Sequence, residues 1–486
     1  MSNIDKRQFI IASEKVEREN FCYRCLDNEL ILSYEKSLKI VEICDGILIG
    51  LAFTIDNGCP VDKNNQQPLE ERLRKWAGRY IVYSKGKIYT DVGNALGIFY
   101  MEKDNKCIAS SSVHLLSQEY GIERNSCQLL YGKGKGEERG GFLTDFFPGP
   151  YTPYEGIKRL MTYETLDFNS EPHVIKNKQA WNQEYVGMDS KELTAKLLEY
   201  TDCIFKNIAQ EYDSIYVPLT AGKDSRCVAA MAKHANVKIR SFTEQRDFRT
   251  HKINVLKSEK KIAEDVARVL DIPWIFSKRK KWDQSKYNEI LTHSGKMIRN
   301  ASLYTYAYGQ YPQPKEEEKM ILIHGSVWEI ALEFYVKRLG VLSKETGVET
   351  IKKRCTFTSK SRVHEESLNV WGQEQEKYGI STLSLTEHLY HEQRMGAWLS
   401  DLNQALDIVD FDRVTLINNY EILSILMAYP KEIRTKALHQ IEIAEACCPQ
   451  LSDIPINKKS KPEKIYSDVV FFKDRCVAKI KKNIHK

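Results

Sequence analysis

The stretch "SIYVPLTAGKDSRCVAA", residues 214–230, decides how the C-terminal half of this chain folds. Residues 214–219 predict a buried strand, and the run that includes Cys227 and Val228 predicts a helix soon afterwards. The loop between them, residues 220–226, then lies at the carboxyl end of a strand, where open α/β sheets bind ligands. Backbone N–H groups and the dipole at the start of the helix favour an anion there. The stretch therefore predicts a phosphate-binding loop.

This loop does not follow the common P-loop pattern of nucleotide-binding proteins. Where that pattern requires Gly the chain has Val217, and where it requires Ser or Thr after the Lys the chain has Asp224. A carboxylate inside a phosphate loop is unfavourable unless a cation lies between the two negative groups, so Asp224 indicates Mg²⁺. The alternative is a tight turn in which Asp224 caps the helix. We favour the phosphate loop with its metal.

Strands and helices alternate around this loop. Residues 237–243 and 273–278 predict two more strands, and residues 258–272 predict a helix between them. This alternation predicts a parallel sheet with helices on both faces, followed beyond about residue 350 by mainly helical structure. Pro218 has no N–H to donate, so its strand must end there or lack a neighbour on that side.

The first part of the chain has a different pattern. Apolar runs separated by Gly, Asn and Asp turns predict strands, and they occupy residues 46–55, 78–93, 96–112, 164–170 and 172–177. At Ser190, the predicted N-cap of a helix, the apolar period changes from two residues to 3.6. We therefore expect an α/β protein of two domains, residues 1–185 and residues 190–486.

Composition excludes several classes of protein. The chain has 486 residues, a net charge of +6 and 42% hydrophobic residues. This composition is ordinary for a globular protein. No apolar run approaches the ~18 residues of a membrane helix, and the N-terminus lacks a signal-peptide pattern, so we expect a cytoplasmic protein without membrane insertion. Cys22-x-x-Cys25 has no second cysteine pair with which to hold zinc. The basic tail from Lys458 onwards suits a solvated helix end better than a nucleic-acid anchor.

Two motifs resemble the asparagine synthetase superfamily. "LTAGKDSR", residues 219–226, resembles its pyrophosphatase loop S-G-G-x-D-S, with Thr220 in place of Ser and Ala221 in place of the first Gly. "HGSVWEIALEFY", residues 324–335, is similar to its second motif, S-G-E-G-S-D-E-x-F-G-G-Y. There Glu329 falls on the metal-binding Asp, whereas Ser326 replaces a Glu and the Gly pair is lost.

Two later segments extend the resemblance. "LYHEQRMGAWLSDLNQALDIVDF", residues 389–411, is similar to the helix before the family's R-x-P-F-L-D segment. By this resemblance, Glu392 and Arg394 face the reacting centre. "CCPQLSDIPINKKSKPEK", residues 447–464, resembles the stretch that carries a catalytic lysine, and Lys458, Lys459 and Lys461 all stay candidates for it.

The N-terminal domain resembles the Ntn-hydrolase-like sandwich of glutamine-dependent synthetases, most clearly over residues 73–117. A working glutaminase uses a Cys directly after the initiator Met, but this chain has Ser2 there, and the residues that would support an N-terminal nucleophile are missing. We therefore do not expect glutamine hydrolysis. The acyl acceptor would then be free ammonia or an amine, as in the branch that contains lasso-peptide cyclases, β-lactam synthetases and polysaccharide-linked relatives.

The resemblance implies a PP-loop synthetase domain that binds ATP and Mg²⁺ and joins a carboxylate to an amine through an acyl-adenylate. Asp224 and Glu329 would hold the metal, Glu392 would orient or deprotonate the amine, and Lys458 or Lys459 would stabilise acyl transfer. The nucleotide contacts implied are Leu219, Thr220, Ala221, Gly222, Lys223, Asp224, Ser225, Arg226, Phe242, Thr243, Gly325 and Ser326.

Other functions stay open at the level of sequence. The expected partner is a small-molecule, peptide or glycan carboxylate, and a homodimer is compatible with the sequence. One alternative is a PP-loop enzyme that modifies tRNA, although no patch of interleaved aromatic and basic residues supports it. Another is a binding protein that kept the fold without the activity, which the lost glycines of the second motif favour.

Overall fold

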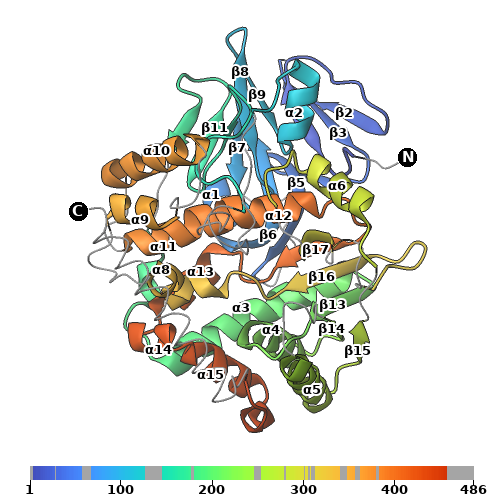
Figure 1. Ribbon diagram of the computed structural model, residues 1–486, viewed down its shortest axis with the longest axis vertical. Helices are drawn as coiled ribbons and strands as arrows, with labels where there is room; N and C mark the ends of the chain where they lie inside the picture. The colour runs from blue at the N-terminus through green and yellow to red at the C-terminus, as the bar shows by residue number, and fades with distance from the viewer. Residues whose placement is uncertain are drawn as a thin grey trace, which may run out of the picture.

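The computed structural model combines two antiparallel sheets with one parallel sheet (Figure 1). It describes residues 4–27, 29–56, 67–125, 145–176, 180–245, 253–277, 281–299, 302–304, 307, 312–339, 347–355, 362–378 and 383–456. The antiparallel strands end at Lys176, and the parallel sheet begins with Ser214. The change of architecture therefore falls in the same part of the chain as the change of apolar period.

The two antiparallel sheets face one another as a sandwich. In the described residues the first has the order β10 (Lys158–Arg159), β8 (Phe99–Lys103), β9 (Lys106–Ser110), β1 (Phe9–Ala12), β3 (Ile31–Glu35), β2 (Phe21–Cys25). The second has the order β12 (Val174–Lys176), β11 (Glu164–Asp167), β7 (Lys87–Thr90), β6 (Trp76–Ser84), β5 (Gly46–Thr54), β4 (Ile40–Ile43). Side chains of both sheets, such as Phe9, Leu32, Ile49 and Ile81, form one apolar core between them.

Short helices cover the outer faces of this sandwich. α2 (Val113–Tyr120) packs Leu115 and Leu116 with Ile10 and Met101 of the first sheet. On the second sheet, α1 (Leu69–Lys75) packs against a cluster that contains Trp76 and Tyr80. The N-terminal half is therefore layered as helix, sheet, sheet and helix.

A long helix, α3 (Ser190–Glu211), opens the second half. Its N-cap is Asp189 rather than the predicted Ser190, because the Asp189 carboxylate accepts from the N–H of Lys191 and Glu192 while the Glu192 side chain returns to the Asp189 N–H. The apolar stripe expected of this helix is confirmed, since all of its predicted members are buried: Leu193, Leu197, Leu198, Ile204, Phe205 and Ile208.

The parallel sheet has its first strand in the middle. Its order in the described residues is β15 (Trp274–Ser277), β14 (Arg240–Glu244), β13 (Ser214–Pro218), β16 (Met320–His324), β17 (Asp412–Thr415). All four pairings are parallel. The chain runs outward from β13 through β14 to β15 and then returns to place β16 on the other side of β13. The order therefore reverses between β13 and β16, which is where open parallel sheets form their ligand crevice.

The remaining helices surround this sheet and the space above it. They are α4 (Lys223–His234), α5 (Ile253–Val269), α6 (Gln284–His293), α7 (Ser302–Tyr304), α8 (Phe334–Leu339), α9 (Val348–Cys355), α10 (Arg362–Tyr378), α13 (Tyr420–Ala428), α14 (Lys431–Thr435) and α15 (Leu438–Cys447). In the described part of the chain, 3₁₀ turns also occur at η2 (Gln183–Tyr185), η4 (Trp328–Leu332) and η7 (Pro449–Asp453). None of the helices described here is long and apolar enough to cross a bilayer.

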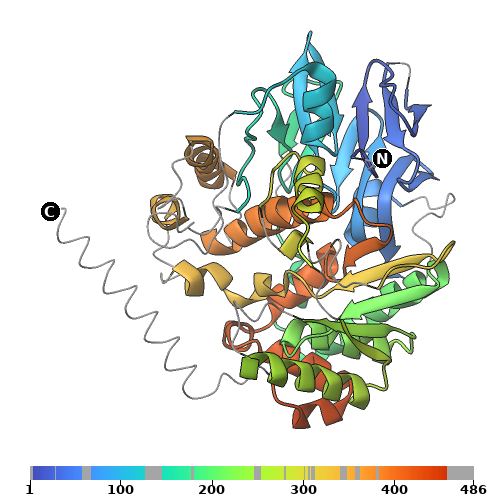
Figure 2. The ribbon, with the colours of Figure 1, turned by 45° about the vertical axis from the view of Figure 1, so that its right-hand side comes forward.

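One continuous helical segment lies between the sandwich and the parallel sheet in both views (Figures 1 and 2). It consists of α11 (Leu385–Leu389), the π-helix η6 (Tyr390–Leu399) and α12 (Ser400–Ala405). Both guanidinium Nη atoms of Arg159 donate to the Asp401 carboxylate at 2.8 Å, and both side chains are fully buried. Gln393 accepts from the N–H of Gly149 at 2.6 Å. Asp401 and Gln393 are thus buried because they bind the sandwich domain.

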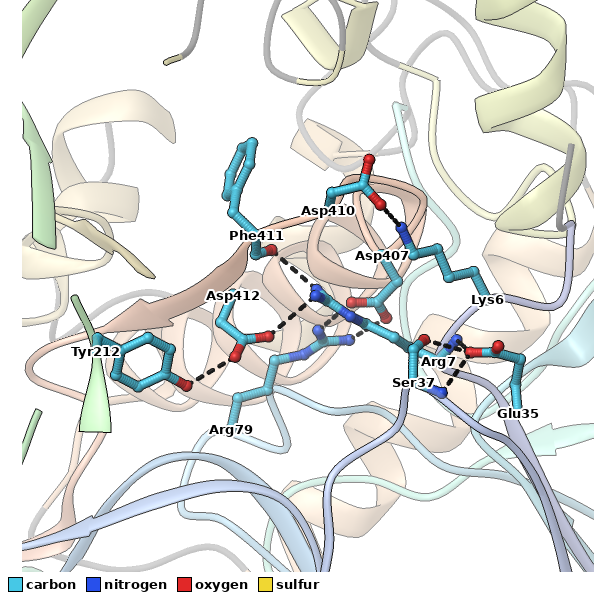
Figure 3. A network of polar contacts seen from close by, with 10 residues as sticks. All are labelled: Lys6, Arg7, Glu35, Ser37, Arg79, Tyr212, Asp407, Asp410, Phe411 and Asp412. Carbon is cyan, nitrogen blue, oxygen red and sulfur yellow. Dashed lines mark hydrogen bonds and ion pairs between the residues drawn. The ribbon is translucent and has the colours of Figure 1, made fainter. Parts of the chain in front are cut away.

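A second set of contacts joins the two halves next to β17 (Figure 3). Arg79 of β6 binds Asp407 with both Nη atoms, one of them at 2.7 Å. Arg7 donates to the carbonyl of Phe411 at 2.9 Å and lies 3.1 Å from the Asp412 carboxylate. Because Asp412 begins β17, the segment that leads into β1 is attached directly to the edge of the parallel sheet.

Candidate functional site

The loop after β13 has the geometry expected of an anion site. β13 ends at Pro218, in agreement with the prediction that the strand either ends at this proline or has no neighbouring strand on that side. α4 begins at Lys223 with Gly222 as its N-cap, and no side chain caps this end. The first N–H groups of α4 are therefore without a capping side chain, as anion-binding helix ends are. Asp224 is the second residue of the helix and not its cap.

The loop is held in shape by its own hydroxyl groups. The Thr220 N–H donates to Ser225 Oγ at 3.0 Å, and the two hydroxyl oxygens lie 3.0 Å apart. The Gly222 N–H donates to Thr220 Oγ1 at 3.1 Å. Ala221 is fully buried in the main core, so the methyl group found in place of a glycine fits here. Gly222 has a φ of −78°, which any residue adopts, so its backbone does not require glycine.

The end of β16 packs directly against the first turn of α4. A Cβ placed on Gly325 would lie 3.0 Å from the carbonyl carbon of Asp224 and 3.0 Å from the backbone nitrogen of Ser225. Glycine at position 325 is therefore needed for this close approach. The two motifs predicted from sequence, about a hundred residues apart, meet at the point where the strand order reverses.

Asp224 and Glu329 are brought together by this packing. Burial first, and the negative charge of Glu329 second, raise the pKa of Asp224 to about 7. Gln440 Nε2 on α15 donates to Asp224 Oδ1 at 2.6 Å, and the Tyr390 hydroxyl donates to Glu329 Oε2 at 2.8 Å.

The backbone around Glu329 is strained. Val327 has a φ of 64° and Glu333 a φ of 50°, so two non-glycine residues in the left-handed region bracket the turn η4. This conformation is especially unfavourable for a β-branched valine. Such outliers persist where the surrounding structure requires a particular placement, and here they flank the turn whose Glu329 charge acts on Asp224.

The donor set suits Mg²⁺. Two carboxylates in electrostatic contact repel one another unless a proton or a cation lies between them, and carboxylate oxygens are the ligands that Mg²⁺ prefers. In nucleotide enzymes Mg²⁺ is bound by one or two carboxylates, with the phosphates and water completing its shell. Gln440 and Tyr390 would orient the two ligands from the second shell. Within the described part of the chain, no three His, Cys, Asp or Glu side chains form a larger metal cluster.

Lys223 and Arg226 bind backbone carbonyls behind this loop, although the charge of Lys223 still acts on Asp224. Lys223 Nζ donates to the carbonyl oxygens of Lys436 at 3.1 Å and Ala437 at 3.3 Å, between α14 and α15. The buried Arg226 donates to the carbonyls of Ile454 at 2.9 Å and Pro455 at 2.8 Å. Their side chains therefore fix the elements behind the loop, including the segment after η7.

A cavity of about 450 Å³ opens between α4, α15 and the segment that follows η7. Gln440 lies in its wall, together with Lys223, Arg226 and Ile454. The three lysines proposed for acyl transfer, Lys458, Lys459 and Lys461, follow this segment but lie outside the described residues, as does Ser2.

The other predicted nucleotide contacts lie along the carboxyl ends of β13, β14 and β16. The Leu219 N–H donates to the Phe242 carbonyl at 2.8 Å, and both side chains are fully buried. The Thr243 hydroxyl donates to the Leu219 carbonyl at 2.7 Å and accepts from Trp274 at 2.9 Å. Ser326 follows Gly325 and is partly buried.

Glu392 is not part of the group formed by Asp224 and Glu329. It lies on the π-helix, buried, where its Oε2 accepts from Trp371 Nε1 at 2.6 Å and from Gln375 Nε2 at 2.7 Å. Its Oε1 lies 3.5 Å from His388 Nδ1. These partners bind Glu392 to α10, so its proposed role at the amine stays a prediction.

Sequence reasoning missed two residues of this site, Tyr390 and Gln440. Tyr390 stands two positions before Glu392 in a segment already singled out, but nothing in its spacing indicates a bond to Glu329. Gln440 lies in an ordinary helical stretch, "ALHQIEIAEA", and is a partner of Asp224 only because α15 packs on α4.

Comparisons with known proteins do not assign a function to this site. No protein-family model matches the chain, and no curated protein sequence matches it. Among solved structures, a glutamine phosphoribosylpyrophosphate amidotransferase from B. subtilis, complexed with ADP and GMP, is similar at 8% identity over 73% of this chain and 84% of that chain. Its TM-score is 0.20, too low to support an argument about fold or function.

Proposed function

We propose that this protein is an ATP-dependent, AMP-forming ligase that adenylates a carboxylic acid and passes the acyl group to ammonia or an amine. One observation carries the proposal: the turn that holds Glu329 packs, through Gly325, against the uncapped start of α4, so the Glu329 charge acts on Asp224 where the order of the parallel strands reverses. An uncapped helix start binds phosphate, and a pair of carboxylates next to it binds the divalent cation that accompanies a nucleotide.

The residues of the loop have separate tasks in this reaction. The N–H groups of the first turn of α4 bind the diphosphate end of ATP, and the hydroxyls of Thr220 and Ser225 keep the loop in shape around it. Asp224 and Glu329 would hold Mg²⁺, which supplies charge neutralisation for the departing diphosphate. Gln440 and Tyr390 keep the two carboxylates oriented.

The finer assignment of fold follows from the same proposal. The parallel sheet would be a PP-loop synthetase domain of the asparagine synthetase type, and the layered sandwich an Ntn-hydrolase-like domain that has lost its nucleophile. The sandwich then acts as a support for the helical segment that carries Tyr390 and Glu392. Ammonia or an amine would have to reach the acyl-adenylate from solution or on the acceptor itself.

The test is isotope exchange between pyrophosphate and ATP with a panel of carboxylic acids. Exchange that depends on both Mg²⁺ and one acid supports adenylation. Asp224→Asn and Glu329→Gln should each lower the exchange rate by about 10²-fold, the loss typical when one electrostatic stabiliser of a transition state is removed. Glu19→Gln, which changes an exposed carboxylate in the loop before β2, is the control. Tight binding of ATP without exchange for any acid would instead identify a nucleotide-binding protein.

A further inference from the structure

The segment that leads into β1, residues 4–8, crosses from the sandwich to the edge of the parallel sheet (Figure 3). We call it the N-terminal strap. The Lys6 ammonium binds the Asp410 carboxylate, and the Arg7 guanidinium lies 3.1 Å from the Asp412 carboxylate. Because Asp412 is the first residue of β17, the strap attaches the sandwich to the start of that strand.

The backbone of the strap is strained at its middle. Arg7 has a φ of 57°, in the left-handed region that a residue with a long side chain rarely adopts. The contacts around it hold this conformation: the Arg7 N–H donates to Glu35 Oε2 at 2.9 Å, and the Gln8 N–H donates to the Asp5 carbonyl at 3.0 Å. Such strain persists only where surrounding contacts maintain it. Losing one of the contacts that anchor the strap therefore favours its release.

His293, the last residue of α6, is an anchor for both ends of the strap. Its side chain is fully buried, with Nδ1 against the Ile4 carbonyl and Nε2 3.2 Å from Gln8 Nε2. A carbonyl only accepts, so Nδ1 carries the proton. The Ser111 hydroxyl donates to Gln8 Oε1 at 2.7 Å, which leaves the Gln8 amide nitrogen to donate to His293 Nε2. Only the neutral ring makes both bonds.

A second proton on His293 has no acceptor waiting for it. It would lie on Nε2, opposite the donating nitrogen of Gln8, and turning the Gln8 amide over would take away the acceptor of the Ser111 hydroxyl. Among the described residues, the charged or titratable groups that act on this ring are Asp5, Asp407, Arg79 and His114. Asp407 already binds Arg79 with both oxygens, and Asp5 already pairs with an arginine at 3.1 Å. Burial lowers the pKa of His293, and the charge of Asp407 opposes this only in part.

We propose that the N-terminal strap is an acid-sensitive connection between the two halves, held closed by neutral His293 and released, together with the start of β17, when His293 is protonated. Below about pH 6.5, the ordinary pKa of histidine, the released state binds a proton that the closed state excludes, so closure weakens as the pH falls. The proposal does not depend on the proposed ligase activity.

Amide hydrogen exchange of the full-length protein at pH 7.5 and pH 5.0 tests this, with each rate divided by the intrinsic rate at the same pH. His293→Asn keeps an N–H donor near the position of Nδ1 but cannot be protonated. Gln8→Glu instead gives a protonated His293 an acceptor. His234→Asn is the matched control, because His234 lies at the end of α4 and pairs with Asp202 at 2.9 Å, away from the strap.

In wild type and His234→Asn, the protection of residues 4–8 and 412–415 should fall at least about tenfold from pH 7.5 to pH 5.0, while that of β6 stays constant. The fall should be absent in His293→Asn and smaller in Gln8→Glu. A wild type without this fall, or an equal fall in β6 that signals general acid unfolding, would overturn the proposal. So would a fall that persists in His293→Asn. If His293→Asn has lost the protection at both pH values, Gln8→Glu decides, and an undiminished fall there contradicts the role of His293.

Discussion

Replacing Asp224 by Asn should stabilise the ligand-free protein, and the gain should grow with pH. Burial and the charge of Glu329 raise the pKa of Asp224 from its usual 3.8 to about 7. The unfolded chain loses this proton near pH 4, so between about pH 4 and pH 7 the folded state binds more protons than the unfolded one. The stability of the wild type therefore falls through this window as the pH rises, whereas the Asp224→Asn variant has no proton to lose there.

The size of the effect follows from the pKa values. A difference of about three pH units corresponds to about 4 kcal/mol, since each unit contributes about 1.4 kcal/mol. For the roughly 270 residues from Ser190 to Ile456, the entropy of unfolding is about 0.6 kcal/mol per kelvin, so 4 kcal/mol corresponds to about 7 °C in Tm. The full difference is expected at pH 8, and almost none of it at pH 4.

The assay is thermal unfolding of wild type and Asp224→Asn in EDTA from pH 4 to pH 8. Because groups distant from Asp224 titrate alike in both proteins, the difference in Tm isolates Asp224 together with the Glu329 charge that is coupled to it. Glu329→Gln should remove part of the pH dependence, since after burial the Glu329 charge is the second cause that raises the pKa of Asp224, and Glu19→Gln, at an exposed carboxylate, serves as a surface control. A Tm difference that does not change with pH would refute the reasoning, because Asp224 would then titrate as an ordinary carboxylate.

Three further changes test the structural supports of the site. Gly325→Ala should destabilise the protein by about 1–3 kcal/mol and weaken ATP binding, measured by calorimetry, because its Cβ has no room against the first turn of α4. Asp401→Asn should lower stability by about 3–5 kcal/mol in denaturant unfolding because it leaves the buried Arg159 unpaired, and Arg159→Met combined with Asp401→Leu should recover most of the loss. Arg226→Met should speed amide hydrogen exchange of residues 449–456 by at least about tenfold, because the carbonyls of Ile454 and Pro455 lose a charged donor, whereas β13 should exchange as before. Unchanged exchange of residues 449–456 would mean that Arg226 does not hold this segment in place.

The features predicted well from sequence are those that local pattern determines. The strand that ends at Pro218, the helix after it and the apolar face of α3 all follow from side-chain chemistry within a few residues. The resemblance to two family motifs predicted that the loop and the segment of Gly325 lie together. The structure gives the physical reason for the glycine, because a side chain at position 325 would crowd the backbone of Asp224.

The features that were missed depend on contacts between distant segments. β17, "DRVT", has four residues of which only one is aliphatic, so its strand character comes from pairing with β16. The π-helix from Tyr390 to Leu399 has a turn that a search for the 3.6-residue period does not detect. Similarly, the resemblance implied that Lys223 and Arg226 contact the nucleotide, and nothing in the sequence indicated that both side chains bind carbonyls of elements that pack behind the loop.

The most direct test of the account is a crystal structure of the protein with Mn²⁺ and a non-hydrolysable ATP analogue, with the metal located by its anomalous scattering. The account predicts a single strong peak within ligand distance of both Asp224 and Glu329, with the diphosphate end of the analogue at the first turn of α4. A metal bound elsewhere, with the Asp224 carboxylate turned toward Gln440 and away from the nucleotide, would contradict it.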